Sequence, residues 1–404
     1  MARQPIAAEA SVSVSTAARP APGDGSSLVG VSLADFAVAF DRWLDANEPQ
    51  LRCHLEADDD YDHRVAISRE LQSMLYDAGW ARWGWPEAAG GLGGTIYHRA
   101  VVAERLSRRG WLGPTIFEHI EIIGPTLCRY LQPQYLAEVF PRYIAGERAW
   151  SQGFSEPEAG SDLAALRTKA VRVPGGYRVS GHKIWTSWAK YASMCLVLVR
   201  TGTPDSRHRG LSMMCVCLDD PGVVVAPIRQ ANGTDELAEV FFDDVFVPDE
   251  AVLGEEGDGW RIAMHLLSHE RGTLSWFRHN LLIGRLEESL ERTPSTMERS
   301  LGSVTIGLLA LRSLALRIVA RAAAGEELGP SAAYNKVTMG VVEQQLFRHL
   351  QGLDEEAFAL GTSDDDAAGL LQQEYLFSGI VTIYGGSRQM QLTTIANQIL
   401  GLPT

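Results

Sequence analysis

The hydrophobic pattern of this chain changes its period twice, and this change limits the folds that the chain can adopt. From Ser32 onward, apolar residues recur at helical spacing, as at Phe36, Phe40 and Leu44. Short segments rich in Val and Phe follow after about position 150, and Gly, Pro or Asp bound them as they bound strands. After Trp260 the helical period returns and continues almost to the end. Because helices and strands do not alternate, the pattern argues against a doubly wound parallel sheet.

We therefore predict an α+β multidomain protein with a helical domain, a central antiparallel β-barrel or sandwich, and a second helical domain. The first residues, 1–30, are rich in Ala, Ser, Pro and Gly without periodicity, and we expect a disordered leader there. The predicted domains then cover residues 31–149, 150–258 and 259–404.

Charge and cysteine content narrow the classes of partner and compartment. The chain has 36 Lys plus Arg against 50 Asp plus Glu, a net charge of −14, which argues against nucleic acid or an anionic membrane surface as the main partner. Its most apolar stretch, 301–324, is interrupted by Arg312, Arg317 and Arg321, so we expect no membrane insertion. The 5 Cys form no C-x-x-C pair, and free thiols in a reducing, cytoplasmic compartment are expected.

Two local patterns invite a functional interpretation that their context does not support. The glycines of residues 90–94 lack the G-x-G-x-x-G spacing and a preceding strand, so a tight turn is favoured over a nucleotide loop. His265 and His269 share one helical face, but Leu266 stands where a zinc hydrolase would carry Glu, and no third ligand is evident nearby. We interpret them as ordinary helix histidines and predict no metal site.

The stretch from Ser155 to Ser187 carries the chemistry. Its first part, S-E-P-E-A-G-S-D-L over 155–163, is a hydroxyl-rich turn that can offer backbone N–H groups and hydroxyls to a carbonyl or phosphate oxygen. Further on, Trp185 and Ser187 are expected on one face of a strand, two residues apart. A flat apolar plate beside a hydroxyl suits an aromatic cofactor such as a flavin, although composition alone favours a packed core residue at Trp185.

These motifs resemble the central signature of acyl-CoA dehydrogenases, in which S-E-P-x-A-G-S-D-L precedes S-G-x-K-x-W-x-S. Further motifs of the family occur in the same order, at residues 79–93, 209–212, 239–248, 257–260, 383–391 and 400–403. The resemblance covers the chain from about residue 32. It implies a C-terminal four-helix bundle, FAD, and α,β-dehydrogenation of an acyl-CoA thioester, with the β-hydride passing to flavin N5 and electron-transfer flavoprotein as the electron acceptor.

The resemblance also assigns site residues by position. The residues that it assigns to the cofactor are Gln152, Phe154, Ser155, Ser161, Trp185, Thr186, Ser187, Ser387 and Gln389. Those that it places beside the thioester and its CoA group are Ser161, Arg271 and Gly386.

The catalytic base departs from the commonest pattern of the family. The reaction needs a carboxylate beside the α-carbon, and many members carry it directly after the Tyr of the C-terminal segment, where this chain has Gly385. Isovaleryl and long-chain members carry it before an Arg near the start of the C-terminal domain, where this chain has Glu270 and Arg271. Glu270 is thus the predicted base, and the competing interpretation is a solvated helix charge paired with Arg271.

A second departure concerns the FAD phosphates. Members of the family usually carry an Arg-x-x-Phe-Gly stretch that reaches the pyrophosphate of a neighbouring subunit's FAD, and residues 290–296 here differ from it. The chain is therefore expected to form at least a dimer, as a homo-oligomer or a hetero-oligomer. Two other functions stay open: a flavin oxidase or monooxygenase of the same fold, and a partner subunit that scaffolds an active chain.

Overall fold

The structure is a computed structural model that describes residues 24–52, 60–110, 116–353, 355 and 366–403. Most of the predicted leader lies outside these residues. The described chain opens with a 3-10 turn at Asp24–Ser27, and the carbonyl of Gly25 accepts a hydrogen bond from Trp83 Nε1 at 2.8 Å. The helices of the first domain are α1 (Leu33–Arg52), α2 (Tyr61–Asp77), α3 (Ile96–Arg108), α4 (Ile116–Tyr130) and α5 (Pro133–Ile144).

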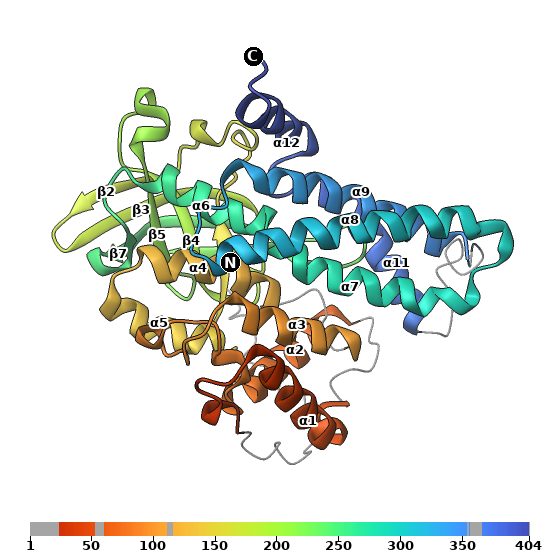
Figure 1. The fold of residues 1–404 in the computed structure, drawn as a ribbon. Helices are drawn as coiled ribbons and strands as arrows, with labels where there is room; N and C mark the ends of the chain where they lie inside the picture. The colour runs from red at the N-terminus through yellow and green to blue at the C-terminus, as the bar shows by residue number, and fades with distance from the viewer. Residues whose placement is uncertain (1–23, 53–59, 111–115, 354, 356–365, 404) are drawn as a thin grey trace, which may run out of the picture.

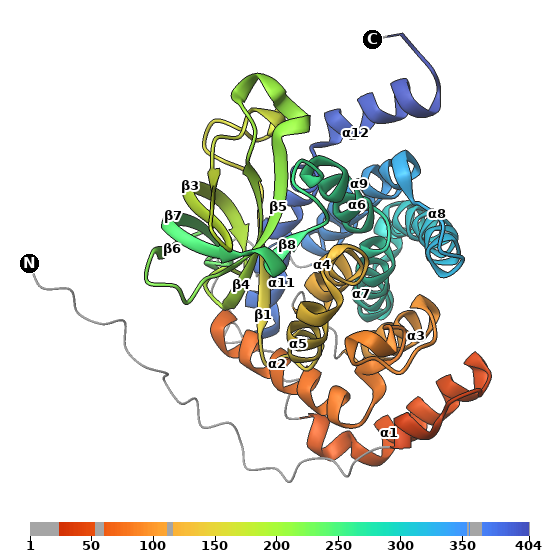
Figure 2. The same ribbon diagram turned by 90° about the vertical axis from the view of Figure 1, so that its left-hand side faces the viewer.

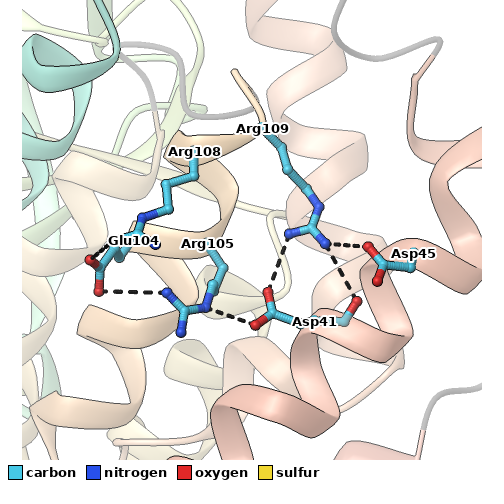
Figure 3. Close-up of polar contacts among 6 residues, drawn as sticks. All are labelled: Asp41, Asp45, Glu104, Arg105, Arg108 and Arg109. Carbon is cyan, nitrogen blue, oxygen red and sulfur yellow. Dashed lines mark hydrogen bonds and ion pairs between the residues drawn. The ribbon is translucent and has the colours of Figure 1, made fainter. Parts of the chain in front are cut away.

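Helix α1 joins this domain through the apolar face that its spacing predicts. Phe36, Phe40 and Leu44 are all fully buried, and the Phe36 ring meets that of Trp80 edge-on at 5.4 Å. On the polar side, Arg105 of α3 bonds to Asp41 at 3.0 Å, and the neighbouring Arg109 also contacts α1 carboxylates (Figure 3). The packed aromatic face and the ion pairs together hold α1 against α3.

The predicted tight turn at residues 90–94 is present. Gly90 and Gly93 adopt left-handed φ angles of 80° and 74°, and the segment folds back so that Gly93 forms a β-bridge with Trp85. A Cβ atom on Gly91 would lie 2.2 Å from the Trp85 carbonyl oxygen, so the turn leaves no room for a side chain there. These glycines serve the packing of the loop.

The central part of the described chain is one eight-stranded sheet. Its strands are β1 (Ala149–Gly153), β2 (Lys169–Val173), β3 (Gly176–Ser187), β4 (Ala192–Arg200), β5 (Leu211–Cys217), β6 (Val223–Ile228), β7 (Leu237–Pro248) and β8 (Val252–Leu253). The order is β6-β7-β3-β2-β4-β5-β8, with β1 paired to β4. Most pairs are antiparallel, while β1 and β2 each run parallel to β4. Figure 2 shows the sheet beside the C-terminal helices.

The last part is helical again, so the predicted fold class is confirmed. Its helices are α6 (Gly259–Arg271), α7 (Leu274–Ser289), α8 (Glu298–Ala323), α9 (Ala332–Gln351), α11 (Asp366–Ser378) and α12 (Arg388–Thr394). Helices α7, α8 and α9 lie side by side, with α11 against α9 (Figure 1). These four helices enclose a separate apolar core that includes Leu282, Leu308 and Phe347.

Helix α8 covers the apolar stretch for which we expected no membrane insertion. Among the described residues, Ser295–Ala323 is long and apolar enough to cross a membrane by length and composition, although its Arg residues led us to expect none. In the structure α8 packs in the bundle through a buried row that includes Leu308 and Leu311. Its apolar character comes partly from a second row on the opposite side, where Ile306 and Leu309 are 70% and 59% exposed.

Candidate active site

Glu270 lies in the last turn of α6, on the face that the helix buries. Ile262, Leu266 and Leu267 face the core, and Glu270 follows Leu266 by four residues, which places it on the same side of the helix. Its side chain is only 3% exposed. The competing interpretation of Glu270 as a solvated charge is therefore wrong.

Gly385 leaves the space that the Glu270 carboxylate occupies. A Cβ atom on Gly385 would lie 2.7 Å from Glu270 Oε1, closer than real Cβ atoms come, and 3.2 Å from its carboxyl carbon. Gly385 also has a φ of +64°, which favours glycine over other residues. The structure thus brings together the two positions at which the family carries its base, 270 and 385, which are 115 residues apart in sequence.

Three side chains, from β1, α6 and α12, bond to this carboxylate or to the glycine segment beside it. Gln152 of β1 donates from Nε2 to Glu270 Oε2 at 3.2 Å. Arg271 donates from Nε to the Gly385 carbonyl at 2.7 Å, and so does not pair with Glu270 as a surface ion pair would. Gln391 donates from Nε2 to the carbonyls of Gly385 and Gly386, each at 3.2 Å.

These contacts refine the predicted roles. The side-chain amide of Gln152, a residue assigned to the cofactor, contacts the carboxylate of Glu270. Gly386 and Arg271, both assigned to the substrate, are neighbours, because a Cβ atom on Gly386 would lie 3.1 Å from Arg271 Nη2. Gln391 was missed, and its one signal in the sequence is its place at the end of the C-terminal motif. Burial lowers the pKa of Arg271, against the opposing effect of Glu270.

Glu156 of the S-E-P motif holds the turn that carries Ser155. Its carboxylate accepts hydrogen bonds from the backbone N–H groups of Arg167, at 2.6 Å, and Thr168, at 2.8 Å. Lys183 of β3, fully buried, donates to the same carboxylate at 2.8 Å and to the Phe154 carbonyl at 3.0 Å. Burial alone would raise the pKa of Glu156, but Lys183 and the hydrogen bonds outweigh it and lower the pKa.

Trp185 is presented to solvent by a bulge in β3. The β3–β7 register shifts between Lys183 and Thr186, and Trp185 has a left-handed φ of 59°, so the regular alternation predicted for this strand is interrupted. The Trp185 side chain is 56% exposed, which contradicts its interpretation as a packed core residue. Thr186 is fully buried, and in the described part of the chain its Oγ1 has no hydrogen-bond partner.

The other predicted cofactor residues are spread over the surface beside this bulge and α12. Phe154 is buried, Ser155 and Ser187 are half-buried, and Ser161 is exposed. Ser387 caps α12, accepting from the Met390 N–H at 3.4 Å, and Gln389 is exposed on that helix. No hydrogen bond among the described residues joins these side chains to the Glu270 cluster.

His265 and His269 lie together on α6, with ring centroids 4.8 Å apart. His265 Nδ1 lies 3.0 Å from Thr126 Oγ1, and the Tyr130 ring meets the His265 ring edge-on. Burial lowers the pKa of His265 to about 4 and that of His269 to about 3. In the described ranges, no group of three His, Cys, Asp or Glu side chains could hold a metal ion.

Comparison with known proteins places these features in one family. Three models match in order: the acyl-CoA dehydrogenase N-terminal domain over residues 52–147, its middle domain over 151–245 and its C-terminal domain over 257–400.

Named relatives and solved structures agree with these models. The "Acyl-CoA dehydrogenase IpdE1" of Mycolicibacterium smegmatis is 36% identical over 83% of this chain and 88% of its own, and that of Mycobacterium tuberculosis is 37% identical with the same coverage. A solved structure titled "Tcur3481-Tcur3483 steroid ACAD" is 26% identical, with a TM-score of 0.76, and the match covers 92% of this chain and 96% of that one.

Proposed function

We propose that this chain, which belongs to the acyl-CoA dehydrogenase family, removes the α-proton of its acyl-CoA substrate with Glu270. Membership establishes the class: the chain is an acyl-CoA dehydrogenase, a flavoprotein oxidoreductase with FAD as cofactor. The observation that carries the proposal is the Glu270 carboxylate, buried and lying in the space that Gly385 leaves.

The contacts of Glu270 suit a general base. The carboxylate is withdrawn from bulk water, and the amide of Gln152 fixes one of its oxygens, so its orientation is set before substrate binds. Arg271 bonds to the carbonyl of Gly385, and Gln391 bonds to those of Gly385 and Gly386, so both hold the segment that faces the base. The basic group therefore has a defined position.

The bulge of β3 fits the isoalloxazine ring of FAD. Trp185 offers an exposed apolar plate, and beside it lie Ser187 and the buried Thr186 Oγ1, which lacks a partner among the described residues. We propose that Trp185, Ser187 and the turn at Ser155 hold the ring, with Phe154, Ser161, Ser387 and Gln389 around it. When bound, FAD supplies the acceptor for the hydride that leaves the β-carbon.

Anaerobic titration with CoA thioesters tests this function. The panel comprises butyryl-, octanoyl-, isovaleryl- and cyclohexanepropionyl-CoA; the last is included because one similar solved protein is named a steroid ACAD. We expect the yellow protein to lose its flavin absorbance with at least one thioester and to reoxidise slowly in air. Rapid reoxidation by oxygen would favour the oxidase alternative, and a protein that never takes up FAD would favour the scaffold alternative.

We propose further that the exposed row of α8 is the surface through which the chain assembles. Members of this family are found as oligomers, and Ile306, Leu309 and Leu316 form an apolar stripe at helical spacing that this chain leaves exposed. Leu309→Glu should weaken self-association or pairing by roughly tenfold or more, because it places a charge in an apolar contact. Sedimentation measures the change.

The matched control is Ser303→Glu, which adds the same charge at an exposed position on α8 at the edge of the stripe. It should assemble as the unmodified chain does. Equal assembly of both variants would contradict the proposed surface. The flavin content per chain, measured on the same samples, distinguishes the two kinds of assembly: fewer flavins than chains would favour a hetero-oligomer, and one per chain a homo-oligomer.

Two further proposals concern the electron acceptor and the cellular compartment. We propose electron-transfer flavoprotein as the acceptor, and a purified bacterial preparation should reoxidise the reduced chain faster than oxygen does. We also propose a cytoplasmic location, supported by four described Cys, at positions 128, 195, 215 and 217, that form no disulfide. Fractionation of the source cells would test it.

A further inference from the structure

A buried lysine contacts the segment that faces Glu270. Lys336 of α9 is 3% exposed, and within the described residues its Nζ has no hydrogen-bond partner. Nζ lies 3.2 Å from the ring centroid of Tyr384, the residue that directly precedes Gly385. A cation buried without a hydrogen bond is costly, so its position beside the site calls for a compensating charge.

The charged groups around Lys336 come from four helices, and most of them already have partners. On α7, Arg278 bonds to both oxygens of Glu343 of α9, at 3.0 and 2.5 Å, and lies 3.5 Å from Glu118 of α4. On α6, Arg271 is committed to the Gly385 carbonyl. Glu270 receives a hydrogen bond from the neutral amide of Gln152.

Two opposite charges in the described part of this cluster thus lack a bonded partner of opposite charge. Glu270 has no cation bonded to it among the described residues, and Lys336 has no anion. Burial lowers the pKa of Lys336 to about 7; Glu270 is the strongest influence in the opposite direction, followed by Glu343, while Arg278 and Arg271 reinforce the lowering. Tyr384 faces the same groups, and burial raises its pKa well above the ordinary value, so it is neutral.

We propose that Lys336 is a positioning residue for the reaction, whose ammonium group stabilises the carboxylate form of Glu270 from across the Tyr384 ring. The inference rests on the proposed role of Glu270. A buried cation attracts a carboxylate over several ångströms, because the interior screens charges weakly. Lys336 thereby keeps the base able to accept a proton at neutral and mildly acidic pH.

The proposal predicts the direction in which the effect of Lys336 on the rate changes with pH. Below about pH 7, Lys336 carries its charge, so it supports the Glu270 carboxylate where protonation competes most. Well above that pH, Lys336 is neutral in the unmodified protein. The unmodified protein and a variant without the charge should then react at similar rates. Loss of the lysine should therefore matter at low pH and fade at high pH.

Lys336→Met removes the charge and keeps much of the side-chain length. Flavin reduction is followed between pH 5.5 and 9 with the fastest of the four thioesters named above. We expect the acidic limb of the rate profile to move up by about one pH unit, so that reduction on the low-pH side of the limb becomes up to about tenfold slower, with rates within about twofold at pH 9. Lys336→Arg, which keeps the charge, should retain the acidic limb of the unmodified protein.

An unchanged pH profile would overturn the proposal. A loss of rate that is equal at every pH would also overturn it, because such a loss indicates a structural role only. Lys336→Gln is the second neutral variant and must show the same shift if the Met variant does not fold. Glu270→Gln separates the two claims: if it reduces flavin normally, the proposed base fails, whereas a Glu270-dependent rate without a Lys336-dependent shift refutes the role of Lys336 alone.

Discussion

Glu270→Gln should reduce its flavin with a CoA thioester about 10⁴-fold more slowly than the unmodified protein, or slower still. General-base groups contribute about 10²- to 10⁴-fold, which is roughly 3–5 kcal/mol of barrier, and an essential base should reach the upper end. Gln keeps the size of Glu and can still meet the Gln152 amide, so the fold and the yellow colour should remain. Stopped-flow absorbance under anaerobic conditions measures the rate.

The matched control is Glu287→Gln, the same chemical change at an exposed position on α7. It should leave the rate unchanged. A second variant uses the geometry directly: the atoms that a Cβ on Gly385 would meet all belong to Glu270, so Glu270→Gly removes the obstacle to Gly385→Glu. The double variant should recover part of the lost rate, limited by the left-handed φ of residue 385. Near-normal reduction by Glu270→Gln alone would contradict the account.

Glu156→Ala should lower the free energy of unfolding by about 3–5 kcal/mol, the range for removing one partner of a buried ion pair. It leaves the N–H groups of Arg167 and Thr168 without their acceptor, and it leaves the fully buried Lys183 ammonium with the Phe154 carbonyl but without its carboxylate partner. Because these groups hold the turn at Ser155, the variant should also lose FAD more readily. Urea unfolding and flavin release on dilution measure the two effects.

The pH dependence of stability gives an independent check. The pKa of Glu156 is lowered in the folded protein, so its contribution is present above the ordinary pKa and is lost as pH falls through the lowered one. The variant should lack this acid-side loss. Glu158→Ala is the control, because Glu158 pairs with Arg167 at the surface, with 73% of its side chain exposed, and such pairs contribute about 1 kcal/mol or less. Equal destabilisation by both changes would contradict the role of Glu156.

Much of the fold could be predicted because its signals are local. The spacing of Phe36, Phe40 and Leu44 indicates a buried helix face, and those side chains are buried. The family motifs led to acyl-CoA dehydrogenase and FAD, and the relatives confirm both. Glu270 could be proposed because Gly385 shows that the common position of the base lacks a carboxylate.

The remaining features depend on contacts between distant parts of the chain, which a single sequence does not record. The Gln152–Glu270 hydrogen bond spans 118 positions, and the contact of Lys336 with Tyr384 depends on how α9 meets the C-terminal segment. The bulge at Trp185 is a register shift against β7, and regular alternation hides it. The apolar stretch of α8 has two apolar rows, one facing the helical bundle and the other facing the exterior. The sequence alone does not show which of the two rows is buried.

The most direct test of the role of Glu270 observes the α-proton itself. Phenylacetyl-CoA has α-hydrogens but no hydrogen that could leave its β-carbon as hydride, so proton removal can be followed alone. With this thioester in D₂O, the unmodified protein should exchange the α-hydrogens for deuterium, as measured by NMR, and Glu270→Gln should exchange them at least about 10²-fold more slowly. Exchange at the same rate in both proteins would contradict the account and place the base elsewhere.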